Sequence, residues 1–394
     1  MSTLRDVVIA SAVRTPVGAF QGALSSLPAT KLGSIVIDQA IKRASINPED
    51  VNEVIMGNVL PAGEGQAPAR QAALGAGLPT RTECLTINKV CGSGLKSVML
   101  AMQAIQVGDA DIIVAGGMES MSNVPYYLPK ARDGYRMGNQ QVVDGMVCDG
   151  LWDVYNDYHM GNAAELCARE NHISREEQDE FAKISYERAQ DAQKNGRFKD
   201  EIVAVEVPQR KGESLIVSED EEPGKARFDK IPQLRPAFEK DGTVTAANAS
   251  KINDGAAALV VMGADVAREK GLPVMARLLG QASAAKDPEW FTTAPVDAMQ
   301  KIAKKTGKNL DSIDLFEINE AFSVVTLVAQ QSLGIPLDKI NVNGGAVALG
   351  HPIGASGARI LTTLLYSLQQ RNLKTGLATL CIGGGEASAV IVER

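Results

Sequence analysis

Three reactive side chains stand beside glycine-rich stretches that lie far apart in the chain. Cys91 precedes Gly-Ser-Gly and a helical pattern, His351 lies within LGHPIGASG, and Cys381 is followed closely by three glycines. Backbone N–H groups and the helix dipole favour a thiolate at the start of a helix, so we expect a lowered pKa for Cys91. The imidazole could be its base, and the second thiol could move a proton at a substrate carbon. These residue types predict acyl transfer through a cysteine thioester on an enolisable substrate.

Each of these residues also has a structural interpretation. A free cysteine is often a small buried hydrophobe, and a histidine in a turn often bonds only to backbone. The glycines around Cys91 and His351, and a repeat that relates them, favour the functional interpretation. Taken alone, Cys381 is as easily a buried strand thiol as a catalytic group. The N–H groups of the glycines after it, Gly383 among them, could stabilise an oxyanion, and the run lacks the Lys-Ser/Thr ending of a P-loop.

Two further polar residues could belong to a site. Asn319 ends an apolar strand-like run, where it could cap the strand or point a water into a pocket. His159 lies in the polar stretch YHMG, and such a histidine is more often structural. The remaining cysteines and histidine have no supporting context and are interpreted as structural or surface residues: Cys84, Cys148, Cys167 and His172.

Composition is that of an ordinary globular protein. The chain has 394 residues, of which 45% are hydrophobic and 22% charged, with a net charge of −7. This predicts two or three domains and argues against a nucleic-acid partner. No apolar run approaches the roughly 20 residues that span a bilayer, and no signal peptide is expected. The five cysteines show no paired spacing and the three histidines are scattered, so we expect reduced thiols, a cytoplasmic location and no metal site.

Apolar strand-like runs alternate with helical patterns, which predicts an α/β fold. Strands are expected at 7–12, 53–59, 111–115 and 256–262, and helices at 31–44, 94–107 and 174–195. The last helix begins with a capping pattern, Ser174-Arg-Glu-Glu. Residues 121–250 are more polar and are interpreted as an insertion. The expected domains are an N-terminal half at 1–120, an inserted loop domain at 121–250, a return to the first half at 251–272, and a C-terminal half at 273–394.

An internal repeat relates the two ends of the chain. Five pairs match in order at a nearly constant offset: Gly77-Leu-Pro with Gly334-Ile-Pro, Asn58 with Asn319, Cys91 with His351, Ser93-Gly94 with Ser356-Gly357, and 116–120 with 383–387. The repeat predicts two similar α/β halves related by a pseudo-twofold axis. Cys91 and His351 would then face each other from equivalent positions.

These motifs together resemble the thiolase family, in its short-chain acetyl-CoA acetyltransferase type, over essentially the whole chain. The resemblance rests on NKVCGSGLKSV, GGMESMS, YHMG, GTVTAANAS, NEAF, GHPIGASGARI and CIGGG. It implies the thiolase fold, in which two β-α-β-α-β-α-β-β halves form α/β/α/β/α layers and a loop domain is inserted after the first half. It also implies a homotetramer, with a tetramerisation loop around 126–149, and a place in fatty acid metabolism.

The resemblance further implies a role for each reactive residue. Cys91 would be acetylated, His351 would activate it and line an oxyanion hole with a water held by Asn319, and Cys381 would be the acid/base at the α-carbon of a second acetyl-CoA. The N–H groups of Cys91 and Gly383 would form a second oxyanion hole. Acetyl-CoA, acetoacetyl-CoA and CoA would be the substrates, with no separate cofactor. The implied CoA contacts are Leu151, His159, Met160, Lys225, Phe238, Ala246, Ala247, Ser250, Ala321 and Phe322.

Three positions bear on specificity. Lys225, in EPGK, is assigned as a phosphate contact, although many bacterial relatives have a basic residue near an Arg-His-Gly there. Pro223 falls where potassium-activated relatives carry Tyr, so the resemblance does not bring a potassium site to this chain. Phe291 takes a pocket position often held by Met, and relatives with Phe there use a 2-methyl-branched substrate.

Several alternatives stay open at this point. A decarboxylating ketoacyl synthase would need Cys-His-His, and a cysteine hydrolase would leave Cys381 unexplained. A degradative 3-ketoacyl-CoA thiolase of broader chain-length range, or a non-catalytic CoA-binding protein, would keep the same fold. The direction of the reaction, its chain-length range and its response to potassium are not determined by these motifs.

Overall fold

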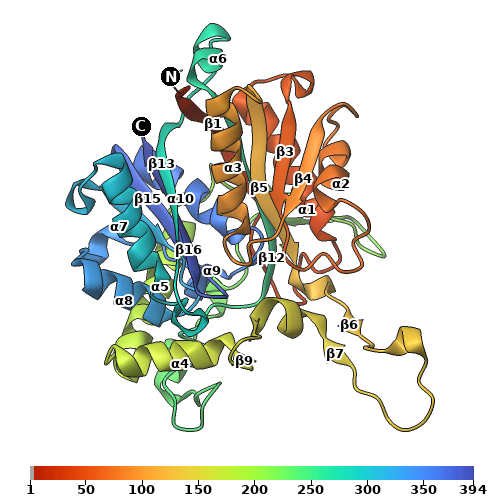
Figure 1. The fold of residues 1–394 in the computed structure, drawn as a ribbon, viewed down its shortest axis with the longest axis vertical. Helices are drawn as coiled ribbons and strands as arrows, with labels where there is room; N and C mark the ends of the chain where they lie inside the picture. Colours follow the sequence, from red (N-terminus) through yellow and green to blue (C-terminus); the bar gives the residue numbers. More distant parts are fainter. Residues whose placement is uncertain (1–3) are drawn as a thin grey trace.

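The computed structural model describes residues 4–394 as two similar α/β halves (Figure 1). The first half consists of β1 (Val7–Arg14), α1 (Ala29–Ala44), β3 (Glu53–Gly57), α2 (Pro68–Gly75), β4 (Glu83–Ile87), α3 (Ser93–Val107), β5 (Ile112–Ser120) and, after a long insertion, β12 (Asn253–Gly263). The second half consists of β13 (Ala276–Ala285), α7 (Ala294–Thr306), β14 (Leu315–Ile318), α8 (Ser323–Leu333), α10 (Ser356–Gln370), β15 (Thr375–Ile382) and β16 (Glu386–Glu393). The third strand of the second half is reduced to a single parallel bridge between Phe316 and Ile340.

The two sheets join edge to edge. The strand order is β4-β3-β5-β12-β1 in the first half and β13-β16-β15-β14 in the second. A short antiparallel pairing of β1 with β13, at Val8 and Ile9, connects them. In the first half β3 pairs in parallel with β4 and β5, and in the second half β14 pairs in parallel with β15. The last two strands of each half, β5 with β12 and β15 with β16, pair antiparallel with each other.

Helices α3 and α10 form the central layer. Their apolar side chains share one core with the facing sides of both sheets. Every residue of α10 from Ser356 to Leu368 is buried, as expected for a helix covered on all sides. Helices α1 and α2 cover the outer face of the first sheet, and α7 covers that of the second. The predicted α/β/α/β/α arrangement is therefore confirmed.

The sequence repeat corresponds to these halves at four of its five matches. Asn58 directly follows β3 and Asn319 directly follows β14, while Ser93 and Ser356 begin α3 and α10. The fifth match is not structurally equivalent, because residues 116–120 lie inside β5 whereas 383–387 span the turn between β15 and β16. The prediction of two similar halves is confirmed, but residues 116–120 and 383–387 lie in different local structures.

Between β5 and β12 the chain forms the inserted region and its short strands and helices. These are β6 (Tyr126–Tyr127), β7 (Val143–Asp144), β8 (Trp152–Asp153), β9 (Tyr158–His159), α4 (Met160–Glu170), α5 (Arg175–Lys194), β10 (Val205–Val207) and β11 (Leu215–Val217). The predicted capping box at the start of α5, between Ser174 and Glu177, is confirmed. The remaining elements are β2 (Gly18–Ala19), α6 (Ala264–Glu269) and α9 (Ala346–Leu349).

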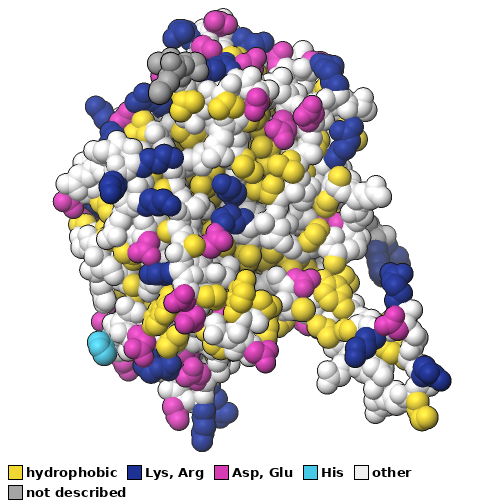
Figure 2. Space-filling view, viewed as in Figure 1, with side chains coloured by type: hydrophobic (Ala, Val, Ile, Leu, Met, Phe, Trp, Pro, Cys, Tyr) yellow, Lys and Arg dark blue, Asp and Glu magenta, His cyan; other side chains and the backbone are white. Residues whose placement is uncertain are grey.

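The segment around β6 and β7 projects from the body of the molecule (Figure 1). Hydrophobic and basic side chains are both visible on this projection in Figure 2. Its exposed large hydrophobic residues are Tyr126, Leu128, Tyr135, Met137 and Val142, and Met137 is 89% exposed. Within residues 4–394 no helix combines the length and the apolar character needed to cross a membrane.

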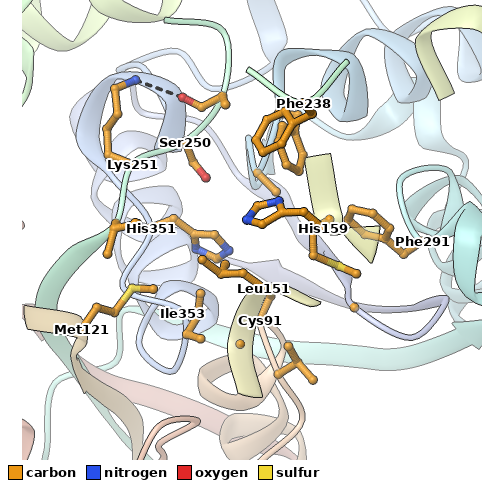
Figure 3. Close-up of a pocket in the computed structure, with 18 residues that line it drawn as sticks. Cys91, Met121, Leu151, His159, Phe238, Ser250, Lys251, Phe291, His351 and Ile353 are labelled. Atoms are coloured by element: carbon orange, nitrogen blue, oxygen red, sulfur yellow. Dashed lines mark hydrogen bonds between the residues drawn. The ribbon is translucent and has the colours of Figure 1, made fainter. Parts of the chain in front are cut away.

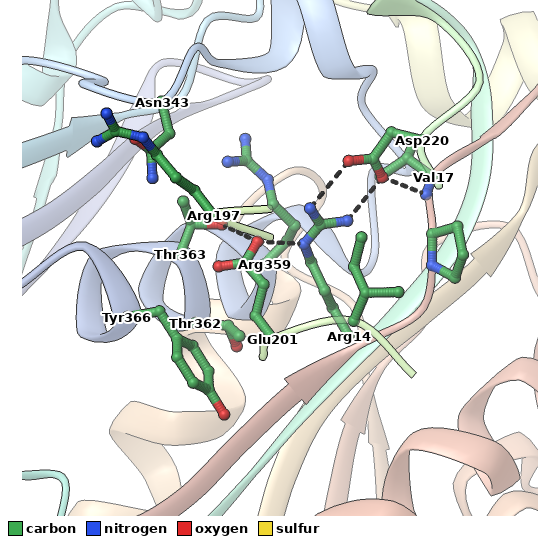
Figure 4. Close-up of polar contacts among 12 residues, drawn as sticks. Arg14, Val17, Arg197, Glu201, Asp220, Asn343, Arg359, Thr362, Thr363 and Tyr366 are labelled. Atoms are coloured by element: carbon green, nitrogen blue, oxygen red, sulfur yellow. Dashed lines mark hydrogen bonds and ion pairs between the residues drawn. The ribbon is translucent and has the colours of Figure 1, made fainter. Parts of the chain in front are cut away.

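A buried ion cluster attaches the insertion to the core (Figure 4). The guanidinium of Arg14, at the end of β1, donates to Glu201 at 2.6 Å and to both carboxylate oxygens of Asp220 at 2.7 and 2.9 Å. Asp220 also accepts from the Val17 N–H, and Glu201 accepts from Thr363 of α10. Because breaking one partner of such a cluster leaves an uncompensated buried charge, the cluster holds the insertion in register with β1 and α10.

Candidate active site

One pocket lies where the two halves meet the insertion (Figure 3). It contains most of the residues predicted from the sequence: Cys91, Leu151, His159, Met160, Phe238, Ser250, Phe291, Ala321, Phe322, His351 and Gly383. The structure also brings in residues that the sequence analysis did not single out: Val90, Met121, Gly150, Ala249, Lys251, Ile252 and Ile353. All but Met121 adjoin or lie within two positions of a predicted residue, so the neighbouring predicted residues were the signal for them.

Five predicted residues do not line this pocket. Cys381 and Asn319 are buried behind its wall, with 0% and 1% exposure. Ala246 and Ala247 lie in the turn that leads to Ser250. Lys225 is half exposed and pairs with Glu222 at 3.2 Å. The assignments of these residues to CoA or to catalysis remain predictions.

Cys91 sits on a strained turn. Val90, directly before it, has a φ of 44°, which a β-branched residue rarely adopts. Two side chains hold this turn: Asn88 accepts from the Val90 N–H at 2.9 Å, and Ser93 donates to the Val90 carbonyl at 2.7 Å. Gly92 has no room for a side chain, because an added Cβ would lie 2.4 Å from Ile382. The turn therefore presents the Cys91 thiol to the pocket immediately before α3 begins.

The expectation of a lowered pKa for Cys91 is wrong for the free site. Burial raises the pKa of the thiol to about 11, although the N–H groups of Gly383 and of Cys91 itself hydrogen-bond the sulfur and act in the other direction. The negative charge of Glu119 adds to the rise. Cys91 keeps some exposed surface, but it lies at the floor of an apolar pocket where a thiolate is poorly solvated. Helix-terminal N–H groups are present as predicted, but desolvation outweighs them.

His351 faces the same pocket in neutral form. Burial and the positive charge of Arg359 lower the pKa of its ring to about 3. Its backbone N–H donates to Asn253 at 2.9 Å, and its Nδ1 lies 2.6 Å from the Ser356 hydroxyl. Its Nε2 is buried and has no hydrogen-bond partner within residues 4–394. An unpaired neutral nitrogen in a pocket with a thiol is suited to accept a proton.

Asn319 is the second buried group with unmet hydrogen bonds. It follows β14, where its N–H donates to the Thr379 carbonyl at 3.0 Å and its own carbonyl accepts from Ala321. Neither atom of its side-chain amide has a partner in the described part of the chain. Buried amides are nearly always satisfied, so this side chain is poised to bind a small polar group.

Cys381 lies inside β15, within the apolar cluster that contains Phe291 and Phe322. Burial raises the pKa of its thiol well above the ordinary range, and the neighbouring Cys91 raises it further. Two glycines with positive φ, Gly384 and Gly385, turn the chain back after it into β16.

Aromatic residues form the outer wall of the pocket. His159 caps α4 by accepting from the Gly161 N–H at 3.0 Å, and its ring stacks on Phe238 with centroids 4.8 Å apart. Phe238 meets Phe322 edge to face at 6.2 Å. Gly161 is required here, since an added Cβ would lie 2.3 Å from the Phe238 ring. His159 thus has a structural role whether or not it contacts a ligand.

Glu119 is a positioning residue that the sequence analysis missed. Its buried carboxylate accepts from the N–H groups of Val59, Leu60 and Gly354 and from the amide of Asn58. It thereby attaches the loop that carries His351 to the first half. Burial raises its pKa to about 8 in spite of these bonds. Its only signal in the sequence was its place within GGMES.

Comparison with known proteins gives the family. Residues 7–265 match the thiolase N-terminal domain and residues 272–394 match the thiolase C-terminal domain. The chain belongs to the thiolase family. It is 54% identical over 390 residues to an acetyl-CoA acetyltransferase of Schizosaccharomyces pombe, with 99% of both chains covered. It is 56% identical over 391 residues to acetyl-CoA acetyltransferase 2 of Arabidopsis thaliana, covering 99% of this chain and 97% of that one.

Solved thiolase structures share the fold throughout. The Acat5 thiolase of Ascaris suum, in complex with coenzyme A, superposes with a TM-score of 0.94 at 45% identity and covers 99% of this chain and 100% of its own. The acetyl-CoA acetyltransferase of Bacillus anthracis gives a TM-score of 0.98 at 40% identity, covering all of both chains. The predicted family and fold are confirmed.

Proposed function

We propose that this thiolase is an acetyl-CoA C-acetyltransferase, which condenses two acetyl-CoA molecules to acetoacetyl-CoA and CoA and catalyses the reverse thiolysis. The observation that carries the proposal is that one apolar pocket contains both the Cys91 thiol, on a strained turn, and the imidazole of His351, whose Nε2 has no hydrogen-bond partner within residues 4–394. A second buried thiol, Cys381, lies in the apolar cluster that includes the pocket residues Phe291 and Phe322. The names of the full-length relatives support acetyl-CoA as the substrate.

In the first step Cys91 attacks the thioester carbonyl of acetyl-CoA. Its proton passes to Nε2 of His351, which becomes imidazolium, and the carbonyl oxygen becomes an oxyanion. The imidazolium N–H and a water bound by Asn319 stabilise that oxyanion. The tetrahedral species collapses to acetyl-Cys91, and the departing CoA thiolate takes its proton from Cys381. Because the free thiol of Cys91 has a pKa of about 11, its deprotonation accompanies the attack rather than preceding it.

In the second step the thiolate of Cys381 removes the α-proton of a second acetyl-CoA. The N–H groups of Cys91 and Gly383 stabilise the enolate oxygen. The carbanion attacks the acetyl group on Cys91, the carbon–sulfur bond to Cys91 breaks, and the imidazolium of His351 returns its proton to the released sulfur. Burial that raises the pKa of Cys381 also makes its thiolate a strong base, which is what an α-carbon requires.

Substrate size is the main specificity question. Phe291 is 2% exposed and lines the pocket, so it limits the space near the reacting acyl group. We infer a preference for acetoacetyl-CoA, extended at most to its 2-methyl derivative. Coenzyme A would lie along the aromatic wall of His159 and Phe238, with Ser250, Ala246 and Ala247 beside it and the half-exposed Lys225 as a phosphate contact.

The deciding experiment is thiolysis of acetoacetyl-CoA by free CoA, measured beside 3-ketohexanoyl-CoA and longer homologues. Cys91→Ala should abolish the reaction. Cys148→Ala, which removes an exposed thiol, should leave it unchanged and is the matched control. Strong activity on long chains would instead favour a degradative 3-ketoacyl-CoA thiolase. Binding of CoA without any thiolysis would favour a non-catalytic CoA-binding protein.

Two wider properties are part of the proposal. The exposed hydrophobic residues of the projecting segment support a homotetramer assembled through it, which analytical ultracentrifugation of the wild type and of Met137→Ser tests. None of the five cysteines is in a disulfide, which fits a reducing, cytoplasmic setting and a place in the metabolism of short acyl-CoA and fatty acids. No cofactor beyond the CoA thioesters enters the proposed chemistry.

A further inference from the structure

Within the described part of the chain the His351 ring makes one hydrogen bond, to the Ser356 hydroxyl at the start of α10. Nδ1 of His351 lies 2.6 Å from Ser356 Oγ, and the same Oγ lies 2.9 Å from the carbonyl oxygen of Pro352. His351 is 5% exposed and Ser356 1%, so solvent does not compete for either. A neutral imidazole carries one ring hydrogen, and the side of the ring that holds it decides which nitrogen can act as a base.

Counting hydrogens assigns the direction of the short bond. A hydroxyl has a single hydrogen, and a carbonyl can only accept. The bond to Pro352 therefore uses the Ser356 hydrogen, and Oγ can only accept from Nδ1–H of His351. The opposite arrangement would leave a buried Nε2–H without an acceptor in the described part of the chain, and orphaned buried N–H groups are rarer than orphaned acceptors.

The first half of the molecule contains the same device in an unambiguous form. Ser93, the equivalent of Ser356, begins α3. Its Oγ accepts from the Lys89 backbone N–H at 2.8 Å and donates to the Val90 carbonyl at 2.7 Å. A backbone N–H can only donate, so the direction of both bonds is determined there. Each serine thus accepts from the turn before its helix and donates to a carbonyl of that turn.

We propose that Ser356 is a positioning residue that holds His351 in the Nδ1–H tautomer, which leaves Nε2 free to take the proton of Cys91. The inference rests on the proposed function for its catalytic consequence. Since the pKa of the ring is lowered to about 3, His351 is neutral at pH 7 and only its tautomer remains to be determined. When Nε2 gains the Cys91 proton, Nδ1–H still donates to Ser356, so the bond persists through the proton transfer.

The tautomer can be observed directly in the wild-type protein. The chain has only three histidines, so ¹⁵N-histidine labelling gives three pairs of ring signals, and His351→Gln identifies those of His351. We expect Nδ1 to be protonated and Nε2 to be bare at pH 7. A spectrum with hydrogen on Nε2 would overturn the inference. This readout does not require activity, so it still decides the inference if the protein fails to cleave acetoacetyl-CoA.

A pair of variants on one helix tests the consequence. Ser356→Ala removes the acceptor of Nδ1–H. Thr362→Val is the matched control, because Thr362 is equally buried in α10 and donates to the Ala358 carbonyl at 2.9 Å away from the site. Ser356→Ala should shift the His351 signals toward the other tautomer. It should also lower kcat and the rate of Cys91 acetylation about 10- to 100-fold, part of the 10²–10⁴ typical of general base catalysis, with little change in KM.

Three outcomes contradict the proposal. The proposal fails if Ser356→Ala has wild-type rates, or if its His351 signals are unchanged. It also fails if Thr362→Val loses as much kcat as Ser356→Ala. Each result would show that Ser356 contributes only packing. If Ser356→Ala does not fold, the wild-type spectrum alone decides the tautomer.

Discussion

Replacement of Gly357 by alanine should force the two central helices apart. Gly357 is the second residue of α10, and an added Cβ would lie 2.2 Å from the backbone nitrogen of Leu95 in α3. Its repeat partner Gly94 makes the reciprocal contact, 2.8 Å from the backbone nitrogen of Ala358. Both distances fall well short of the 3.4 Å at which ordinary van der Waals contact begins. A backbone atom cannot rotate away as a side chain can, so the helices themselves must move.

The size of the effect follows from two opposing terms. Alanine favours a helix by about 1 kcal/mol over glycine. Overpacking typically costs about 1–3 kcal/mol and more where backbone must shift, so we expect a net destabilisation of about 2 kcal/mol. For a chain of this length that corresponds to a fall in Tm of about 2–3 °C. Cys91 precedes α3 and His351 precedes α10. Separating the helices should therefore also lower the rate of thiolysis, even at temperatures where the protein stays folded.

Scanning calorimetry and the thiolysis assay on the same preparations measure both effects. Gly33→Ala is the matched control, since Gly33 lies in helix α1 and its added Cβ would meet the flexible thioether of Met118 rather than backbone. It should lose less stability and no activity. A Gly357→Ala protein with the wild-type Tm and wild-type thiolysis, or one no worse than Gly33→Ala, would refute the reasoning.

Three further changes test the electrostatics of the site. Alkylation of Cys91 by iodoacetamide should rise about tenfold per pH unit from pH 7 to 10, because the thiol has a pKa of about 11 and only the thiolate reacts. Burial lowers the pKa of Lys251 from 10.5 to about 8, so between these pH values the unfolded chain binds more protons than the folded one. The free energy of unfolding of the protein should therefore rise by about 3 kcal/mol between pH 8 and pH 10.5. Urea titrations should show this rise in the wild type and not in Lys251→Met. Asn319→Leu should leave Tm unchanged or higher, because the amide loses no hydrogen-bond partner among residues 4–394, yet lower thiolysis about 10²–10³-fold.

Each of these has its own control and contrary result. A plateau in alkylation below pH 8 would mean that Cys91 is a stabilised thiolate, and Cys91→Ala corrects for the other thiols. Lys240 is exposed, so Lys240→Met should keep the rise in the free energy of unfolding between pH 8 and 10.5. If both lysine variants lose this rise, groups other than Lys251 cause it. An Asn319→Leu protein that is destabilised but fully active would make Asn319 a structural residue.

Local signals were sufficient for two helices of the first half. Helix α3 begins one residue before the predicted start and α1 two residues before, since apolar periodicity and glycine stops act within a few positions. Strand β5 was predicted too short, because Gly116 and Gly117 look like strand breakers. The structure needs them for contacts from afar, as a Cβ at Gly117 would lie 2.0 Å from the Gly354 carbonyl oxygen.

The sequence predicted which residues line the pocket better than it predicted their pKa values and hydrogen-bond partners. The repeat predicted that Cys91 and His351 face one pocket, and both line it. The predicted shift in the pKa of Cys91 was wrong in direction, because the shift depends on burial by pocket walls from many segments that lie far apart in the chain. Glu119 was missed for the same reason: its partners Leu60 and Gly354 lie in different halves of the molecule.

The paired asparagines show how a repeat separates position from function. Asn58 and Asn319 each directly follow the equivalent strand of their half, β3 and β14. In the first half Glu119 accepts the amide hydrogen of Asn58 at 2.9 Å and makes it part of the scaffold. In the second half the neighbouring carboxylate, Glu320, instead accepts from Ser185, Asn341 and the Val347 N–H. Neither side-chain atom of Asn319 has a hydrogen-bond partner in the described part of the chain. The two copies of this position therefore differ in whether a nearby carboxylate satisfies the asparagine amide.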